Sequence, residues 1–211
     1  MKKAKFQTKL IFYNVLIFLI ITVLVMGLFY YYLVNNISKR MIADFEALAN
    51  KSAGQMNTLI YNMDKTALQI AANPTVVNYF NAIPKDKDTN YFINEPLVSN
   101  EIIKLLNSYN FKKDGNSRVC LYNDSNDFVY SATTMTTSTA VADFFNTDTF
   151  KQTQKYFENN NAYSLFKAPK SDILNDSLLP SPSYIAIVRE IKDYFTGIRK
   201  NGYVEVQQDV A

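Results

Sequence analysis

The chain has 211 residues with 22 Lys+Arg, 19 Asp+Glu, one cysteine and no histidine, and its formal net charge is +3. The absence of histidine excludes Ser-His and Cys-His nucleophile pairs and His-ligated zinc, and the single cysteine excludes an intramolecular disulfide or a thiolate metal site. Only five glycines are present, and no spacing among them forms a phosphate loop or a dinucleotide fingerprint. We therefore expect no catalytic residues, no metal site and no cofactor in this chain.

The first feature in chain order is an apolar segment, residues 10–34, which lies in a stretch without a charged residue between Lys9 and Lys39. A helix of this length is about 37 Å long and crosses a hydrocarbon core of about 30 Å with some tilt. A secretory signal has a shorter apolar region and a small-residue cleavage site, whereas this segment ends in the bulky residues 29–33. Tyrosines in that run suit a membrane–water interface. We expect an uncleaved transmembrane helix over residues 10–34.

The lysines around this segment predict its orientation. Lys2, Lys3, Lys5 and Lys9 crowd the N-terminal flank without an opposing acid, so the positive-inside rule keeps residues 1–9 in the cytoplasm and sends the rest outside. Four of the 22 basic residues thus precede the span and all 19 acids follow it, which leaves the outer part at 18 minus 19, or −1. The positive net charge of the chain therefore comes from the lysines that set the membrane orientation, and we expect no nucleic-acid binding by the outer part.

A long helix is predicted to continue from the span over residues 35–72. Apolar residues recur there mostly at steps of three and four, the period of one helical face: Ile37, Met41, Phe45, Leu48, Met56, Leu59, Met63, Ala67 and Ile70. Asn73-Pro74 ends the pattern, because proline disfavours helix at the residue before it. Two interpretations remain open: the helix packs on its own domain, or it is a stalk that transmits motion, as part of a dimer.

Residues 73–211 have the pattern of an α+β domain with an antiparallel sheet. We expect helices over 75–83, with Thr75 as a possible N-cap, over 95–111, starting near Pro96, and over 140–159. The predicted strands are 118–122 and 128–133, which form a hairpin around the turn Asn123–Asp127, and 184–193 and 202–208.

Two acid pairs in this domain have the residue types of a calcium site. Asp86 and Asp88 lie in a polar loop, and Asp124 and Asp127 lie in the hairpin turn. Neither pair has the spacing of an EF-hand, and turn propensity explains both.

The candidate ligand-binding residues are Arg189, Tyr184, Tyr130 and Tyr122. Alternation along the strand at 184–191 predicts Ile185, Ile187, Arg189 and Ile191 on one face and Tyr184, Ala186, Val188 and Glu190 on the other. Arg189 on the more apolar face has donors for a carboxylate or phosphate, and the alternative is a partly exposed arginine or one paired with Asp143, Asp193 or another acid. The tyrosines either line the sheet or fill the core, and we expect Arg118, at a strand start, on the surface.

In order and spacing, these segments resemble the extracytoplasmic sensor region of Gram-positive sensor histidine kinases with a double-Cache domain. The resemblance covers essentially the whole chain and depends on QMNTLIYNMDKTALQIAANPTVV, RVCLYNDSNDFVYSA and YIAIVREIKDYFTGIRKNGYVEVQQDV. It implies a long N-terminal helix followed by a PAS-like (Cache) antiparallel sheet flanked by helices, with a small-molecule pocket on the sheet. The chain contains no tryptophan, so the Trp-containing amino-acid-binding signature of some such receptors is missing and the ligand class does not carry over.

The resemblance implies a function as the ligand-sensing, non-catalytic part of a membrane-bound two-component sensor kinase. The chain includes no kinase domain or phospho-accepting histidine, so we expect it to be the N-terminal part of such a receptor. The expected location is the cell membrane, with one span, and the expected partners are a small-molecule ligand and a second copy of the chain. Alternatives are the sensor region of a membrane-bound transcriptional regulator or chemoreceptor, or an anchored surface binding protein without signalling.

Overall fold

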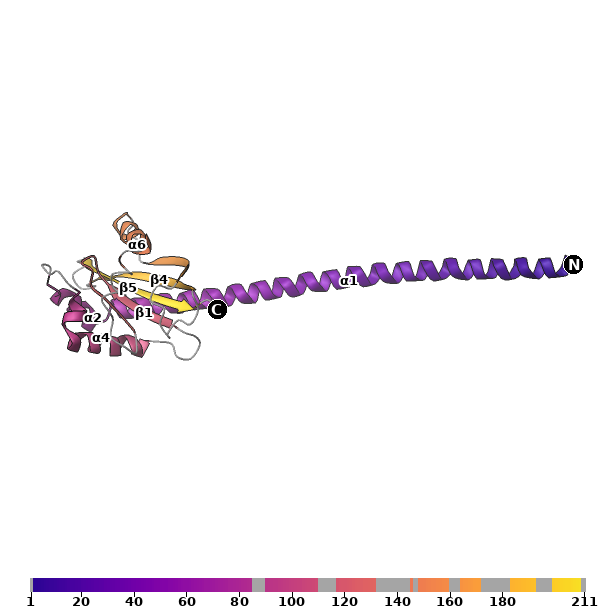
Figure 1. Ribbon diagram of the computed structural model, residues 1–211. Helices are drawn as coiled ribbons and strands as arrows, with labels where there is room; N and C mark the ends of the chain where they lie inside the picture. The colour runs from indigo at the N-terminus through magenta and orange to yellow at the C-terminus, as the bar shows by residue number, and fades with distance from the viewer. Residues whose placement is uncertain are drawn as a thin grey trace. The chain divides into compact units, whose positions relative to one another are not determined.

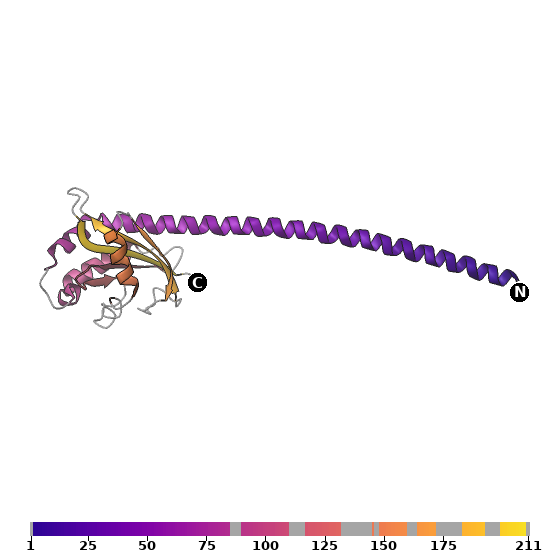
Figure 2. The ribbon, with the colours of Figure 1, turned by 90° about the horizontal axis from the view of Figure 1, so that it is seen from above.

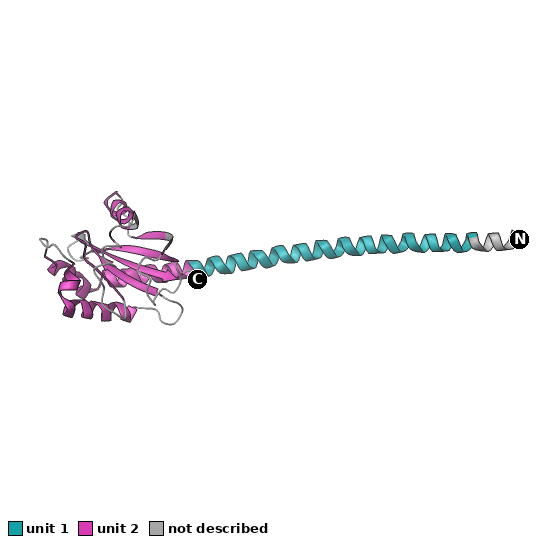
Figure 3. Ribbon diagram, viewed as in Figure 1, with its two compact units in different colours: residues 1–56 teal, residues 57–211 magenta. Residues whose placement is uncertain are grey.

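Unit 2 of the structure, residues 57–211, is built around a five-stranded sheet, whereas the described residues of unit 1, which spans residues 1–56, all belong to one long helix (Figure 3). The computed structural model describes residues 2–84, 90–109, 117–131, 145, 148–159, 164–171, 183–192 and 199–209. Asp86 and Asp88, the predicted turn after residue 111, the proline-containing loop before residue 183, and Asp143 and Asp193 lie outside these residues.

The helix α1 runs without a break from Lys2 to Ala71, one residue from its predicted end. Its N-terminal part is long and apolar enough to cross a membrane, with a mean hydropathy of 2.6 in its best window. The large apolar side chains of residues 10–34 have exposed fractions of 39% to 72%. Such a surface is far larger than the apolar patches that soluble proteins leave in water. The helical stripe predicted beyond it divides into two parts: Ile37, Met41, Phe45 and Leu48 are exposed, whereas Met63, Ala67 and Ile70 are buried.

The sheet is entirely antiparallel, with the strand order β2-β1-β5-β4-β3. Its strands are β1 (Ser117–Tyr122), β2 (Phe128–Tyr130), β3 (Leu165–Ser171), β4 (Ser183–Lys192) and β5 (Arg199–Asp209). The turn between β1 and β2 places Asn126 at φ 61°, a left-handed conformation that asparagine tolerates better than most residues. β5 pairs with both β1 and β4, so the central strand of the sheet is the last in sequence.

Two hydrophobic clusters lie on the two faces of this sheet. One face carries Val119, Leu121, Val129, Ile185, Ile187, Ile191, Val204 and Val206, which pack with the end of α1 and with α2 (Pro74–Ala82), α3 (Tyr91–Asn94) and α4 (Pro96–Tyr109). The opposite face carries Cys120, Tyr122, Phe128, Tyr130, Val188 and Tyr203, which pack with Phe150 and Phe157 of α6 (Asp148–Asn159). We call these the α1 face and the α6 face. Figures 1 and 2 show α6 on one side of the sheet, with α2 and α4 on the other.

The two faces confirm the alternation that was predicted for β4. Ile185, Ile187 and Ile191 belong to the cluster on the α1 face, whereas Val188 belongs to the cluster on the α6 face. The α+β class and the antiparallel sheet are likewise as predicted from the sequence.

Three details of the prediction were wrong. The N-cap of α2 is Asn73, whose Oδ1 accepts a hydrogen bond from the Thr75 backbone N–H at 2.9 Å, so Thr75 is a capped residue and not the cap. The strand β3 was not predicted, because its sequence LFKAPKS has a proline and two lysines where apolar alternation would mark a strand. Arg118 is fully buried, not on the surface.

Candidate functional site

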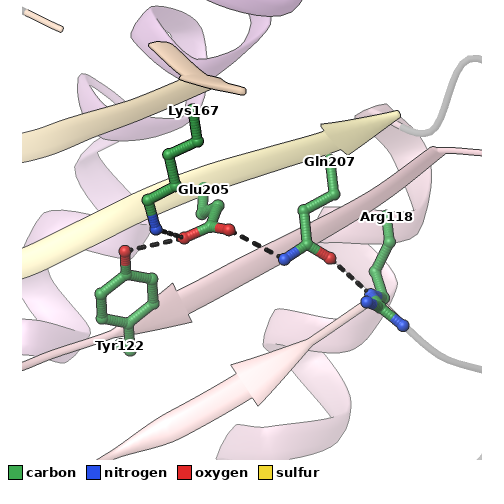
Figure 4. A network of polar contacts seen from close by, with 5 residues as sticks. All are labelled: Arg118, Tyr122, Lys167, Glu205 and Gln207. Carbon is green, nitrogen blue, oxygen red and sulfur yellow. Dashed lines mark hydrogen bonds and ion pairs between the residues drawn. The ribbon is translucent and has the colours of Figure 1, made fainter. Parts of the chain in front are cut away.

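Five polar side chains form a buried network on the α6 face of the sheet (Figure 4). Arg118 Nε donates to Gln207 Oε1 at 2.7 Å, and Gln207 Nε2 donates to Glu205 Oε1 at 2.9 Å. The second carboxylate oxygen, Glu205 Oε2, accepts from Tyr122 OH at 2.9 Å and from Lys167 Nζ at 2.7 Å. Glu205 is therefore the centre of the network, with a cation on either side of it.

Strand alternation and register bring these residues together. Glu205 and Gln207 are two apart on β5, so both point to the α6 face, while the alternating Val204 and Val206 point to the α1 face. Cross-strand pairing then sets Arg118 of β1 opposite Gln207. Because directly paired residues of antiparallel strands lie on the same face, Arg118 and Gln207 are held side by side by backbone geometry alone.

The network shifts the ionisation of its members. Burial by itself raises the pKa of Glu205, but the charge of Lys167 and the hydrogen bonds from Gln207, Lys167 and Tyr122 outweigh it and hold that pKa below its usual value. Burial, followed by the charge of Glu205 and the hydrogen bond to it, raises the pKa of Tyr122 well above 10, against the lowering effect of a hydrogen bond with Thr153. Glu205 is thus an anion and Tyr122 a neutral phenol at neutral pH.

Aromatic rings enclose the network. The Arg118 guanidinium carbon lies 5.9 Å from the ring centroids of both Tyr130 and Tyr184, within the range of cation–π attraction. The Tyr122 ring packs on Phe150 of α6 and on Tyr203 of β5, with centroids 5.8 Å and 5.4 Å away. This face therefore combines charged groups with aromatic rings, the composition of many small-molecule sites.

The predicted site residues fall on both faces of the sheet. Tyr122, Tyr130 and Tyr184 are buried on the α6 face, in or beside the network. Arg189 is on the α1 face, where its Nε and Nη2 donate to the two carboxylate oxygens of Asp64 at 2.8 Å and 2.6 Å. The structure thus brings the three tyrosines together, and it gives Arg189 an acidic partner from α1.

Sequence reasoning missed Arg118, Lys167, Glu205 and Gln207. Lys167 lies in the unpredicted strand β3, so it had no assigned face. Glu205 and Gln207 alternate with valines in GYVEVQQ, a pattern that normally indicates a strand with one face in water. The available signal was that the same face also carries Tyr203, because an aromatic residue in a polar row indicates burial.

Metal ligation has no support in the described residues. No group of three or more His, Cys, Asp or Glu side chains able to hold a metal ion occurs among the parts of the chain that the structure describes. Asp127 instead accepts hydrogen bonds from the Tyr91 backbone N–H at 2.7 Å and from Asn123 Nδ2 at 2.8 Å, so it joins the hairpin turn to the first residue of α3.

Comparisons with known proteins give no assignment for this arrangement. No protein-family model and no curated protein matches the chain. The function therefore has to be inferred from the residues themselves.

Proposed function

We propose that the chain is the extracytoplasmic ligand-sensing part of a membrane-bound two-component sensor histidine kinase. In this proposal the α+β unit is a PAS-like Cache domain, and a small molecule binds on its α6 face beside the buried network. The main support for this proposal is that β4 contacts the network on one face and α1 on the other. Tyr184 borders the network on one face, and Arg189 on the other face binds Asp64 of α1 through two hydrogen bonds. A displacement of β4 by a ligand therefore acts on the helix that leads toward the apolar segment.

The composition of the α6 face also favours a binding role. Replacing a buried ion pair by apolar residues of similar volume is often neutral or stabilising. The need for a stable sheet thus does not by itself explain why Lys167 and Glu205, which are at most 6% exposed, are charged residues. A site that recognises a polar ligand does require such groups, since they fix its orientation and its chemistry.

The apolar part of α1 supports attachment to the cell membrane. Residues 10–34 carry bulky apolar side chains on all sides of the helix, and such a helix needs a non-aqueous surrounding. Together with the four lysines before residue 10, this favours a single span with the N-terminus in the cytoplasm and unit 2 outside.

Signalling in this proposal is a shift between two arrangements of α1 in a homodimer. A ligand changes such an equilibrium only by as much as it binds one arrangement better than the other. The chain itself is non-catalytic in this proposal, and the output belongs to another part of the receptor.

Two other functions fit the same unit. The sensor region of a membrane-bound transcriptional regulator or chemoreceptor would use an identical input with a different output. An anchored surface protein that binds a partner without signalling would leave α1 unchanged on binding. A sensor, whatever its output, is therefore distinguished from a surface binding protein by a change in α1.

The experiment that tests the sensing role is a thermal-shift screen of a small-molecule library on the full chain in detergent micelles. We expect at least one compound to raise the melting temperature of the wild type and not of the Lys167→Met/Glu205→Gln double variant, which removes both charges of the ion pair together. Arg189→Ala is the second variant. If the compound no longer raises the melting temperature of this variant, Arg189 contributes to ligand binding. No hit in the library, or equal shifts in the wild type and the double variant, would contradict binding at the network.

Topology is tested by cysteine labelling in intact cells. The native Cys120 is buried, so the wild-type chain should react weakly with a membrane-impermeant maleimide and serves as the control. We expect Leu97→Cys, at a side chain that is 80% exposed in α4, to be labelled and Lys3→Cys not to be labelled. Labelling of Lys3→Cys and not of Leu97→Cys would show the opposite orientation.

A further inference from the structure

Lys167 is a buried cation with spare hydrogen-bonding capacity. Its side chain is 6% exposed, and among the described residues its Nζ has one partner, Glu205 Oε2 at 2.7 Å. A lysine ammonium has three N–H donors, so the contact with Glu205 leaves two of them for other acceptors. Glu205 accepts three hydrogen bonds, from Tyr122, Lys167 and Gln207, of the roughly four that a carboxylate can accept. Most of the remaining hydrogen-bonding capacity of this ion pair is therefore donor capacity at Lys167.

Arg118 lies across the sheet from Lys167, at the other end of one row of paired residues. The row runs Arg118–Gln207–Ala186–Lys167 over the adjacent strands β1, β5, β4 and β3. Arg118 bonds to Gln207, and Gln207 and Lys167 both bond to Glu205, whereas Ala186 between Gln207 and Lys167 contributes only a methyl group. Since neighbouring strands are about 4.8 Å apart, the backbone positions of Arg118 and Lys167 are about 14 Å apart, and only their long side chains bring the two charges closer.

The strand that carries Lys167 is irregular next to it. β3 is an edge strand, and its register with β4 shifts between Lys167 and Lys170. Such bulges are frequent beside functional sites, where they redirect a side chain. Here the irregularity begins directly after the residue whose ammonium lies over the network.

We propose that the α6 face binds a small oxyanion, a carboxylate or a phosphate, through the Lys167 ammonium. Arg118 supplies a second positive charge to the same field, and Gln207 orients it. Oxygen anions match these donors because charge-assisted hydrogen bonds from ammonium and guanidinium groups are roughly twice as strong as hydrogen bonds between neutral groups. This inference rests on the proposed sensor function and names the chemical class of its ligand.

The test measures the melting temperature of the full chain in detergent at constant ionic strength, set with sodium chloride. The probes are acetate, inorganic phosphate, the neutral isostere acetamide and the cation methylammonium. We expect acetate or phosphate to raise the melting temperature in a saturable way, and the two neutral or cationic probes to leave it unchanged. The anion that raises the melting temperature shows whether the site binds a carboxylate or a phosphate.

Variants assign the effect to Lys167. We expect the affinity for the responding anion to fall at least tenfold in Lys167→Met and in the charge-balanced Lys167→Met/Glu205→Gln, the second keeping the test valid if the first does not fold. Lys155→Met, at an exposed lysine of α6, should bind as the wild type does. Equal anion binding in the double variant, or no anion response in the wild type, would overturn the inference. If a library compound without negative charge binds at the network, the oxyanion proposal is overturned but the proposed sensor function stands. If no compound binds at all, both the oxyanion proposal and the sensor function are contradicted.

Discussion

Arg189 and Asp64, 125 residues apart in the sequence, form a two-point ion pair between β4 and α1. The guanidinium Nε and Nη2 meet Oδ1 and Oδ2 of Asp64 at 2.8 Å and 2.6 Å, and the side chains are 14% and 31% exposed. The neighbouring buried residues of α1, Met63, Ala67 and Ile70, make apolar contacts, which constrain rotation and sliding of a helix less than directed hydrogen bonds do. The pair therefore fixes how the end of α1 sits on the sheet.

A double-mutant cycle should detect this pair. We expect Asp64→Asn and Arg189→Gln each to lower the free energy of unfolding, with a coupling energy of about 1 kcal/mol, because the pair is charged, doubly hydrogen-bonded and only partly screened by water. The measurement is urea denaturation of the full chain in detergent, followed by circular dichroism. The exchange Asp64→Arg/Arg189→Asp should recover part of the loss. Strictly additive single effects would show that the pair does not stabilise the helix on the sheet.

Tyr122→Phe should destabilise unit 2 although it removes only one oxygen. The change takes away a donor to the buried Glu205 carboxylate and the partner of Thr153, and it leaves the ring contacts with Phe150 and Tyr203 in place. We expect a loss of about 1–3 kcal/mol in the free energy of unfolding, the cost of an incompletely hydrogen-bonded buried group.

Tyr156→Phe, at a half-buried tyrosine of α6, is the matched control and should change stability less than Tyr122→Phe does. If both substitutions have the same small effect, the hydroxyl of Tyr122 is not needed to hold Glu205.

The pH dependence of stability should reveal Glu205. Its pKa is lower in the folded chain than its ordinary value of 4.5, so the folded state favours the carboxylate over the acid. The stabilisation is then fully present above pH 4.5 and is lost as the pH falls through the lower folded value. Carboxylates titrate at roughly pH 5 to pH 3. Over this range we expect the free energy of unfolding to fall more in the wild type than in Glu205→Gln. Parallel pH profiles would contradict the lowered pKa.

Gly202→Ala should weaken the packing of α2 on the sheet. A Cβ at position 202 would lie 2.6 Å and 2.8 Å from two ring carbons of Phe80 and 3.1 Å from Cδ1 of Ile191. We expect a loss of about 1–3 kcal/mol, the usual cost of overfilling a packed core, in thermal or urea denaturation. The double variant Gly202→Ala/Phe80→Leu should recover stability relative to Gly202→Ala, and a fully neutral Gly202→Ala would mean that Phe80 moves aside freely.

Most of the helices and strands could be predicted because their signals are local, whereas the four-residue helix α3 and the strand β3 were not predicted. The period of apolar residues and the Asn-Pro stop gave the end of α1, and proline at the first position gave the start of α4. Alternation in β4 gave its two faces before any partner strand was known. The pairing of β5 with β1 could not be predicted in the same way, because it joins residues 81 to 91 positions apart and depends on the register of the whole sheet.

The candidate site was the part that sequence reasoning described least well. The tyrosines predicted to line the sheet lie at the network: Tyr122 is a member of it, and Tyr130 and Tyr184 border it. Arg118 and Glu205 were not predicted at the site, because a charged residue in a strand normally indicates a solvent-exposed face. Their burial becomes visible only when three strands and α6 come together, so that each charge meets a partner from a distant part of the chain.

The measurement that tests the sensing account most directly is the distance between α1 and α6 with and without a bound compound. Spin labels at Lys65→Cys and Lys155→Cys, both exposed in the structure, report on the two helices that lie on opposite faces of the sheet. Pulsed electron resonance on the full chain in nanodiscs compares the free state with saturation by the compound that gives the largest thermal shift. The account predicts a changed distance distribution in the wild type that Arg189→Gln reduces. An unchanged distribution at saturation would contradict a sensor that signals through α1.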